Sequence, residues 1–425
     1  MRPPVAHLPG IDLCRRLMLP LLLVSSGPLF AEPVPAGDGD TLRITWSDLR
    51  PAIEAHPRLE AARAATRLAA GARREAGALP NPGLEAHSLS VDPRNGADPT
   101  REEDFAVGIP LDWLWTRPGR LKAARAGEQM ARAESGLMGR ELLLEAGEAF
   151  WSLVREQALV ESMDELDRQM QTLQQAVATR VRVGEARPVE AARVEVEVLQ
   201  TGLEAAAARR SLALDRDLLA QWLLPDKGRL LVAEADLLRL PALPDAADRD
   251  GALRGHVRLD AARSRIEAER GALNVERMGV LPRLELQGSL ERAEDRLARG
   301  AGLALELPLF NWKQGRIEQA RARLQAAEAG LAAESRRLES DLSSAVAAFE
   351  TSREQARVYQ EQVLPRAEEA ARVLESTWRA GEASLFELID ARRTLAAIRR
   401  QSILVFCQAQ LDGLRLQTLL EKEMN

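Results

Sequence analysis

The chain has 425 residues, of which 29% are charged and only 4% are aromatic, and its formal net charge is -6. This length suits two or three ordinary domains or one elongated body, and the composition favours long helices over compact aromatic cores. Acidic and basic residues are interleaved and no basic block stands out, which argues against a nucleic-acid-binding protein.

The first 31 residues predict an export signal. Arg15 and Arg16 precede an apolar run over residues 17–24, and Ala31 supplies a small residue for cleavage. The alternative is a membrane anchor. A run of this length is too short to cross ~30 Å of hydrocarbon as a helix, so the signal is the better interpretation.

The two cysteines restrict the mature chain further. Cys14 lies before the apolar run, where a lipid-acceptor cysteine would follow it, so we expect no lipid anchor. Cys407 is then alone and forms no intrachain disulfide. No run of 18 or more apolar residues occurs. If the mature chain enters a membrane, we therefore expect it to do so as strands of a barrel.

The sequence repeats itself with an offset near 200 residues. The segment from His56 to Arg63 recurs as the segment from His256 to Arg263. Further matches keep the same order with offsets between 196 and 202: Leu79-Pro80 with Leu281-Pro282, Pro110-Leu111 with Pro308-Leu309, Gly119-Arg120 with Gly315-Arg316, Arg155–Ala158 with Arg353–Ala356, and Gly184–Ala186 with Gly381–Ala383. We therefore predict a tandem duplication with repeats at 32–225 and 250–425, joined by 226–249.

Each repeat predicts the same series of elements: a helix, two strands, a long helix, a turn and a returning helix. Leucines at positions 303, 305, 307 and 309 alternate with other residues, a period of two that indicates a strand with one apolar face. The expected helices are 47–78, 119–183 and 188–224, then 250–278, 316–380 and 384–422, and the expected strands are 83–91, 103–111, 281–291 and 301–310. Ser47 and Asp48 are candidate caps of the first helix.

Four strands of this length suit a tilted bilayer crossing but cannot close a barrel alone. Free sheet edges are not tolerated in lipid, so other copies of the chain must supply strands, and three copies give twelve. The charged helices must then project into water as coiled-coil-like pairs. The predicted fold is mainly α: a trimeric twelve-stranded β-barrel continued by an α-helical coiled-coil barrel. The alternative is a soluble periplasmic coiled-coil scaffold with β-hairpin caps, which leaves the export signal unexplained.

Three motifs carry a resemblance to a known family: Leu79-Pro-Asn-Pro82, the strand-to-helix segment 307–316, and the helix-turn segment 378–392. Over residues 45–422 the sequence resembles the TolC family of outer-membrane efflux proteins, and its first motif looks most like the heavy-metal branch of CzcC- and CusC-like proteins. The resemblance implies a homotrimeric duct in the outer-membrane lipid that extends into the periplasm. It implies a periplasmic adaptor and an inner-membrane pump of the resistance-nodulation-division class as partners.

The resemblance implies a negatively charged aperture at the periplasmic end. Glu387 and Asp390 align with the family's two acidic aperture positions, and Glu190 matches an acidic latch position. Three chains would place these carboxylates in a ring that favours cations. The alternative is that Glu387 and Asp390 are ordinary first-turn acids at a helix N-terminus.

Other latch and docking positions follow from the same alignment. Trp378 stands where an aromatic latch residue is expected, and Arg187 or Arg193 could replace the basic latch partner, whose position holds Ala383. Gly184 and Gly381 permit positive φ at the hairpin tips, where the adaptor would dock.

The residues show no catalytic constellation and no cofactor or metal site. The four histidines are dispersed, and no nucleophile elbow, phosphate loop or dinucleotide fingerprint occurs. We therefore expect no enzyme activity. The expected cargo is heavy-metal cations or small toxic molecules, and a duct for type I polypeptide secretion is the alternative within the same family.

Overall fold

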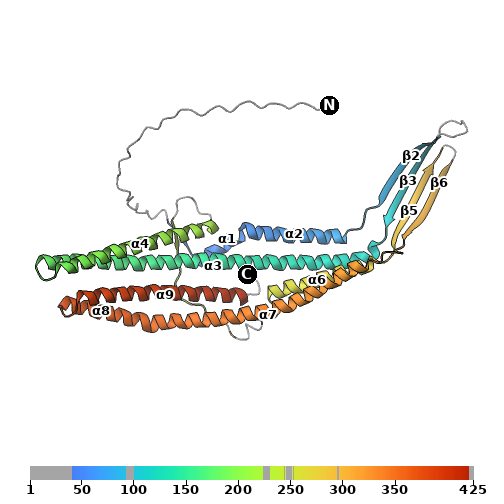
Figure 1. The fold of residues 1–425 in the computed structure, drawn as a ribbon. Coiled ribbons are helices and arrows are strands. Elements are labelled where there is room, and N and C mark those ends of the chain that lie inside the picture. The colour runs from blue at the N-terminus through green and yellow to red at the C-terminus, as the bar shows by residue number, and fades with distance from the viewer. Residues whose placement is uncertain are drawn as a thin grey trace, which may run out of the picture.

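The computed structural model describes residues 41–91, 100–223, 230–243, 245, 251, 253–293 and 296–420. The export signal predicted over residues 1–31 lies outside the described residues, as do residues 226–229, 244 and 246–249 of the predicted joint. The chain is elongated, with helices running side by side along its length and a sheet at one end (Figure 1).

Two long helical hairpins form the body. In the first, α3 (Trp113–Arg182) returns as α4 (Pro188–Leu223). In the second, α7 (Gln314–Val358) and α8 (Leu364–Ala380) return as α9 (Leu385–Leu420). Both hairpin turns lie at the end of the molecule opposite the sheet (Figure 1). No helix in the described part of the chain is both long and apolar enough to cross a membrane.

Two shorter helices pack along the parts of α3 and α7 nearer the sheet (Figure 1): α2 (Pro57–Gly77) and α6 (Val257–Met278). Each begins after a histidine that caps it in the same way. The Nδ1 atom of His56 accepts a hydrogen bond from the Arg58 amide at 3.2 Å, and that of His256 accepts one from the Arg258 amide at 3.1 Å. The two halves of the chain thus share the same histidine cap at equivalent helices.

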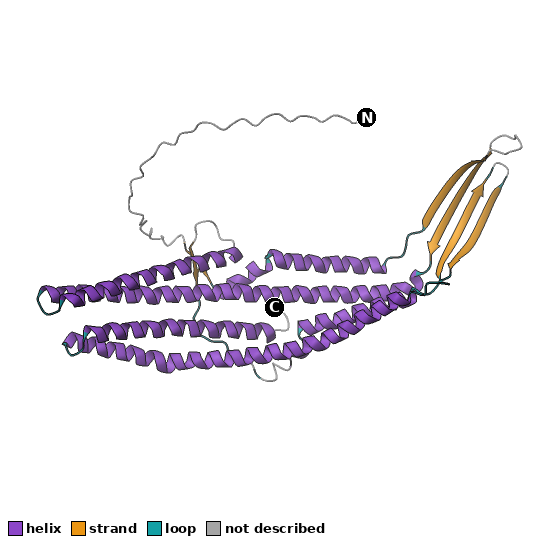
Figure 2. Cartoon of the chain, in the orientation of Figure 1, coloured by secondary structure: helices purple, strands orange, loops and turns teal. Residues whose placement is uncertain are grey.

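The four-stranded sheet is antiparallel with the order β2-β3-β5-β6 (Figure 2). Its strands are β2 (Gly83–Val91), β3 (Thr100–Pro110), β5 (Arg283–Arg292) and β6 (Leu297–Glu306). Each repeat contributes one hairpin, and β3 joins them by pairing with β5. Strands β2 and β6 each have one edge without a partner in the described chain.

A second, two-stranded sheet was not predicted. β1 (Thr41–Ile44) pairs in parallel with β4 (Leu230–Ala233), which lies inside the segment predicted as a joint. Ile44 and Leu231 belong to the core cluster that also buries Phe150 of α3. The predicted joint therefore contains a strand that pairs with the start of the first repeat. Its four-residue strands are too short to show a clear period in the sequence.

The predicted strand 301–310 was wrong by several residues, because β6 runs from Leu297 to Glu306. Pro308 has no N–H to donate to a ladder, so the alternating leucines continue beyond the strand. The strand begins early because the hairpin turn is tight, with the Ala293 amide bonded to the Arg296 carbonyl at 2.9 Å. Strand β3 likewise begins at Thr100, three residues before its predicted start.

The helix predicted over 316–380 is interrupted. A π-helical turn at Tyr359–Val363 separates α7 from α8. Pro365 lies in the first turn of α8, and its missing N–H cannot bond the carbonyl four residues earlier. The wider turn accommodates that loss without ending the helix.

The helices predicted to start at 47, 119 and 250 also differ from the structure. The segment predicted as one helix from residue 47 consists of a 3-10 turn (Trp46–Asp48) and α1 (Leu49–Glu54). After a break at residues 55–56, α2 begins at Pro57. Thr45, with Asp48, forms the capping box in place of the predicted Ser47 cap. The helix predicted to start at residue 119 is α3, which starts earlier, at Trp113, and contains Pro118. The helix predicted to start at residue 250 is α6, which starts later, after the cap at His256.

Candidate functional site

The tips of the two hairpins turn through left-handed glycines. Gly184 has φ 80° and Gly381 has φ 83°, the region where a Cβ is unfavourable. Gly381 ends α8, and its amide bonds to the Trp378 carbonyl at 3.0 Å. The predicted tip glycines are therefore required by the backbone of both turns.

One hydrophobic cluster joins the two hairpins just behind these turns. It includes Leu173 and Val177 of α3, Val194 of α4, and Leu388 and Ile389 of α9. All five are almost fully buried. The two tips therefore form one packed unit, in which the first turns of α4 and α9 are held close together.

Glu387 caps the helix on which it lies. Its Oε2 accepts hydrogen bonds from the Ser384 amide at 2.7 Å and the Ser384 hydroxyl at 2.8 Å. These bonds lower the pKa of the Glu387 carboxyl, with the backbone bond as the larger cause. Asp390 is exposed and forms no hydrogen bond or ion pair with other described residues. Glu387 thus has a local structural role, whereas Asp390 has no such contact among the residues that the structure describes.

Glu190 occupies the position in α4 that Glu387 occupies in α9. Its Oε1 lies 3.0 Å from Nε of Arg187, which is largely exposed. An exposed pair of this kind contributes little stability, about 0–1 kcal/mol. Arg187 is therefore paired within its own hairpin, and its partner Glu190 is one of the acids expected at the aperture.

Two stacked arginines connect the hairpins at the tips. The guanidinium of Arg180 lies 4.5 Å from the ring centroid of Trp378, and that of Arg193 lies 4.6 Å from the ring centroid of Phe386. Trp378 is only 9% exposed. Within one chain the predicted latch residues Trp378 and Arg193 thus bind one hairpin to the other.

Adjacent arginines of α9 reach both helices of the first hairpin. Arg392 donates to the Gln169 carbonyl of α3 at 2.8 Å and lies 3.4 Å from Glu375 of α8. Arg393 forms a 2.7 Å ion pair with Glu197 of α4. Burial lowers the pKa of Arg392 below its usual range.

Sequence reasoning missed Arg180, Phe386, Arg392, Arg393 and Glu197. The sequence feature that could have pointed to Arg392 and Arg393 is a pair of consecutive arginines in a helix whose later residues are mostly apolar. Nothing in the sequence pairs Arg180 with Trp378, because the two belong to different repeats.

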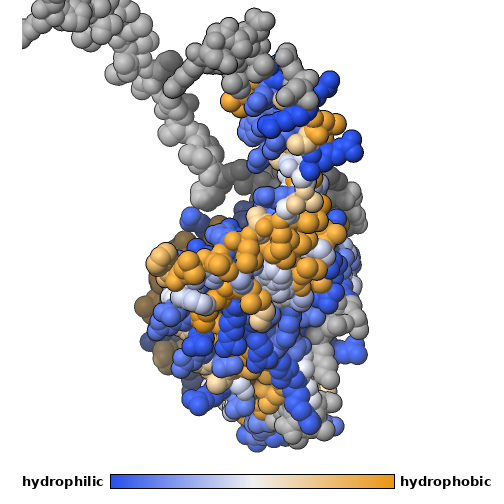
Figure 3. Space-filling model, turned by 90° about the vertical axis from the view of Figure 1, so that its right-hand side faces the viewer, coloured by the Kyte–Doolittle hydropathy of each residue, from blue (hydrophilic) through white to orange (hydrophobic). Residues whose placement is uncertain are grey.

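The sheet forms the second part of the site and has two unlike faces. Cross-strand pairs Leu84–Val107, Ile109–Leu286 and Leu286–Leu303 place apolar side chains on one face. Leu84 is 73% exposed and Leu303 is 62% exposed. Figure 3 looks at the end of the molecule that carries the sheet and shows hydrophobic residues gathered there in a band.

The opposite face of the sheet is polar and acidic. His87 pairs across the strands with Asp104, which in turn pairs with Glu291 of β5. Glu285 lies on this face over Gly108, where a Cβ would collide with its carboxylate. A strand arrangement with one exposed apolar face and one polar face is typical of a transmembrane barrel wall.

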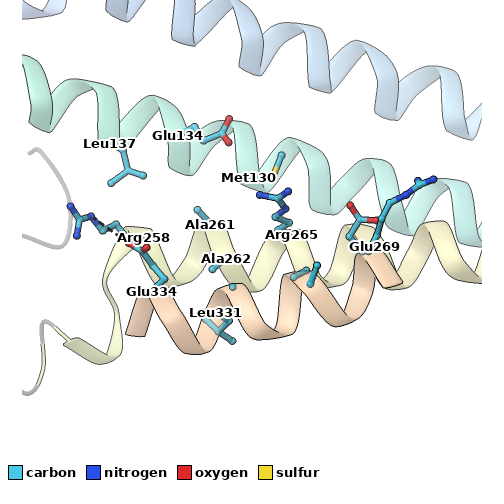
Figure 4. A pocket seen from close by; sticks show the side chains of 14 residues that line it. Met130, Glu134, Leu137, Arg258, Ala261, Ala262, Arg265, Glu269, Leu331 and Glu334 are labelled. Carbon is cyan, nitrogen blue, oxygen red and sulfur yellow. Dashed lines mark ion pairs between the residues drawn. The ribbon is translucent and has the colours of Figure 1, made fainter. Parts of the chain in front are cut away.

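A cavity of about 480 Å³ lies between α3, α6 and α7 (Figure 4). Arg258 and Glu334 meet at one end of it, with Arg258 Nε 3.7 Å from Glu334 Oε1. Met130 and Leu331 line it further along. None of the predicted site residues lies here. Within the residues that the structure describes, no group of three or more His, Cys, Asp or Glu side chains is arranged to hold a metal ion.

Comparisons with known proteins agree on one kind of molecule. Residues 250–421 match the family model for the outer membrane efflux protein. The chain is 27% identical over 331 residues to the cobalt-zinc-cadmium resistance protein CzcC of Cupriavidus metallidurans, covering 76% of this chain and 77% of that protein.

Solved structures share the fold at low sequence identity. The structure of CusC matches with a TM-score of 0.75 and 17% identity over 91% of this chain and 95% of that one. The outer membrane protein VceC from Vibrio cholerae matches with a TM-score of 0.72 and 18% identity over 88% of this chain and 95% of that one.

The chain thus shares the fold of CusC and VceC, and its two-faced sheet suits the wall of a barrel. The match over residues 250–421 and the similarity to CzcC make the chain similar to outer membrane efflux proteins of the TolC type.

Proposed function

We propose that three copies of this chain assemble into the exit duct of a tripartite efflux system. The observation that carries the proposal is the sheet, which has an exposed apolar face and two edges that pair with no other strand in the described part of the chain. Unpaired backbone groups in lipid cost several kcal/mol each, so the edges must be joined to other chains. Three four-stranded sheets make a closed barrel of twelve strands with its apolar face toward lipid and its acidic face toward the lumen.

The helices continue this barrel as a water-filled tube through the periplasm. Their apolar positions face neighbouring helices and their charged residues face water, as in laterally packed coiled coils. The sheet and the hairpin tips lie at opposite ends of the chain (Figure 1). In the assembled duct the tips, with Gly184 and Gly381, would meet the periplasmic adaptor, beyond which lies an inner-membrane pump of the resistance-nodulation-division class.

We propose that Glu387, Asp390 and Glu190 line the periplasmic aperture. Three copies would bring their carboxylates around one axis, and like charges held close favour cations and oppose tight closure. Asp390 supports this role because it is exposed and has no partner among the described residues. Trp378 and Arg193 would act as latch residues by keeping the two hairpins together, and Arg187 would do so by pairing with Glu190 within the first hairpin.

The cargo we propose is a divalent heavy-metal cation. The relative from Cupriavidus metallidurans is a cobalt-zinc-cadmium resistance protein. The polar sheet face carries an excess of carboxylates, among them Glu85, Asp104 and Glu291, which would attract cations to the lumen. In this proposal the pump would supply the energy for export, and the duct would supply the path for the cation.

The test is a deletion strain complemented with the wild-type gene or an empty vector. We expect loss of the gene to increase sensitivity to cobalt, zinc and cadmium salts, with complementation restoring resistance. Sensitivity only to organic toxicants would point to a drug duct, and loss of a secreted polypeptide would point to type I secretion. A purified protein that is monomeric and soluble without detergent would support the periplasmic scaffold instead.

A further inference from the structure

Lys313 is the one residue other than glycine with a left-handed backbone in the described part of the chain. It has φ 52° and ψ 24° and occupies the N-cap of α7, where an extended backbone is usual. Only glycine, and less often asparagine or aspartate, adopts the left-handed conformation without appreciable strain. Such strain persists only where the surrounding structure holds the residue in place, so the contacts of the lysine side chain decide its role.

The Lys313 side chain reaches the end of α6. Its Nζ lies over Gly279, the C-cap of α6, where an added Cβ would be 2.8 Å from that nitrogen. The same Cβ would lie 3.2 Å from the carbonyl oxygen of Val275 and 3.5 Å from that of Glu276. The ammonium therefore lies near the last carbonyls of α6, at the negative end of the helix dipole, and Gly279 leaves the space that it occupies.

The first repeat makes the same connection with an arginine. Arg117, near the start of α3, donates from Nε to the carbonyl oxygen of Gly77, the last residue of α2, at 2.8 Å. Gly77 and Gly279 are 202 positions apart, and Arg117 is 196 positions before Lys313. Both offsets belong to the range of the repeat. Each repeat thus brings a cation from its long helix to the carbonyl end of its short helix.

Each of these connections joins the two ends of one β-hairpin. Helix α2 precedes β2 and α3 follows β3, and α6 and α7 flank β5 and β6 in the same way. The sheet leaves the helices at an angle at this end of the body (Figure 1). A cation that ties the two helix ends therefore also ties the entry and the exit of the hairpin to each other.

Neighbouring cations do not share this arrangement. Arg120 and Arg316 lie three residues further along α3 and α7, are exposed, and form no hydrogen bond or ion pair with other described residues. Arg117 and Lys313 are half-buried. Position, and not charge alone, therefore distinguishes the two cations at the junction.

We propose that Arg117 and Lys313 are positioning residues, which fix the direction in which the two β-hairpins leave the helices. The inference rests on the proposed duct and says what joins its barrel to its tube. The sheets of three copies can pair only when every sheet stands at the same angle to its helices. A junction that moved freely would lose entropy each time a copy joined, which would oppose assembly. The cations order it beforehand.

The test measures how firmly the sheet is held against the helices. One nitroxide label is placed at Ser289→Cys on β5 and one at Gln325→Cys on α7, both at exposed positions, in the full-length protein with both native cysteines replaced. Co-expression with an excess of cysteine-free copies keeps the labels of one trimer on one chain. Pulsed electron paramagnetic resonance in lipid nanodiscs then gives the distribution of distances between sheet and helix. We expect a narrow distribution when both cations are present.

Arg117→Gln combined with Lys313→Gln should broaden this distribution and reduce the fraction of heat-resistant trimer severalfold. The conservative pair Arg117→Lys with Lys313→Arg keeps both cations and should restore the narrow distribution. Arg120→Gln with Arg316→Gln removes the same amount of charge from the same helices and should change neither measurement.

Lys313→Asn separates the ammonium from the backbone angle and leaves Arg117 in place. Asparagine tolerates the left-handed conformation but carries no charge, so we expect a broad distribution here too. A narrow distribution in both Lys313→Asn and the double glutamine variant would overturn the positioning role and leave the proposed channel intact. Broad distributions in variants of a protein that passes no current would support the positioning role and count against the channel.

Discussion

The Arg180 guanidinium of α3 lies 4.5 Å from the ring centroid of Trp378 of α8, which joins two hairpins from different repeats. The contact lies behind the tip turns, where Trp378 also enters the buried cluster that the hairpins share. The geometry of the hairpin tips therefore depends on a contact that neither hairpin makes alone.

We expect Trp378→Ala to loosen the tips. Removing a buried tryptophan from a packed cluster costs ~3–5 kcal/mol, and here it also removes the cation–π contact. Hydrogen exchange of α8 and of the first turns of α9 should become faster. Trp378→Phe keeps an aromatic face for Arg180 and should show a smaller change. Equal exchange in all three proteins would mean that the contact does not hold the tips together.

We expect Glu387→Gln combined with Asp390→Asn to weaken the block of channel conductance by divalent cations. The glutamine keeps a side-chain acceptor for Ser384, so the helix cap is largely preserved while the charge is lost. Glu382→Gln, at an exposed acid of the same turn, is the control. Block that is unchanged in the double variant would reject the aperture assignment.

We expect the two faces of the sheet to respond oppositely to charge. Leu303→Arg puts a cation on the apolar face near the middle of β6, at a cost of ~2–4 kcal/mol in the bilayer. The amount of heat-modifiable trimer in outer membranes should fall. Gln287→Arg, on the polar face, should be tolerated. Similar losses in both variants would show that the apolar face does not meet lipid.

We expect the free energy of unfolding to fall in mild acid because of His256. Burial, aided by Arg140 and Arg258, lowers the pKa of His256 from 6.5 to about 4. Between these values the unfolded chain binds a proton that the folded chain does not. Stability from this group is therefore full above pH 6.5 and lost as the pH falls toward 4, by roughly 3 kcal/mol.

His256→Asn keeps a cap acceptor for α6 but cannot titrate, so denaturant unfolding at pH 7.5 and pH 4.5 should differ less in this variant. His56→Asn, at the equivalent cap of α2, controls for the loss of an imidazole. A pH dependence unchanged by His256→Asn would contradict the assignment.

We expect the tip glycines to resist substitution. Gly381→Ala places a Cβ at φ 83° and should lower the thermal midpoint, at a cost of about 1 kcal/mol. Gly330→Ala is the matched control, because Gly330 lies inside α7 with nothing within 4 Å of an added Cβ. It should raise stability slightly. If both changes had the same sign, the turn would not require a positive φ.

The long elements could be predicted because their periods are long and uninterrupted. The alternation of Phe105, Val107 and Ile109 located a strand, and the recurrence of His56 as His256 located equivalent helix starts. The boundaries were less accurate. Leu307 and Leu309 continue the alternating pattern past the end of β6, and Pro365 widens one turn without ending the helix.

The contacts of the site were not predictable from one sequence. Whether Arg180 meets Trp378 depends on how two repeats pack, and the pairing of β1 with β4 depends on segments almost 190 residues apart. Positions of Glu387 and Gly381 followed from the family resemblance and the repeat. Their hydrogen bonds and backbone angles required the structure.

The central claim is that copies of this chain close a channel through their sheets. Its most direct test is the single-channel conductance of the purified full-length protein in a planar lipid bilayer. We expect discrete, long-lived current steps that favour cations over anions. A protein that incorporates into the bilayer as a stable trimer and yet passes no current would contradict the claim.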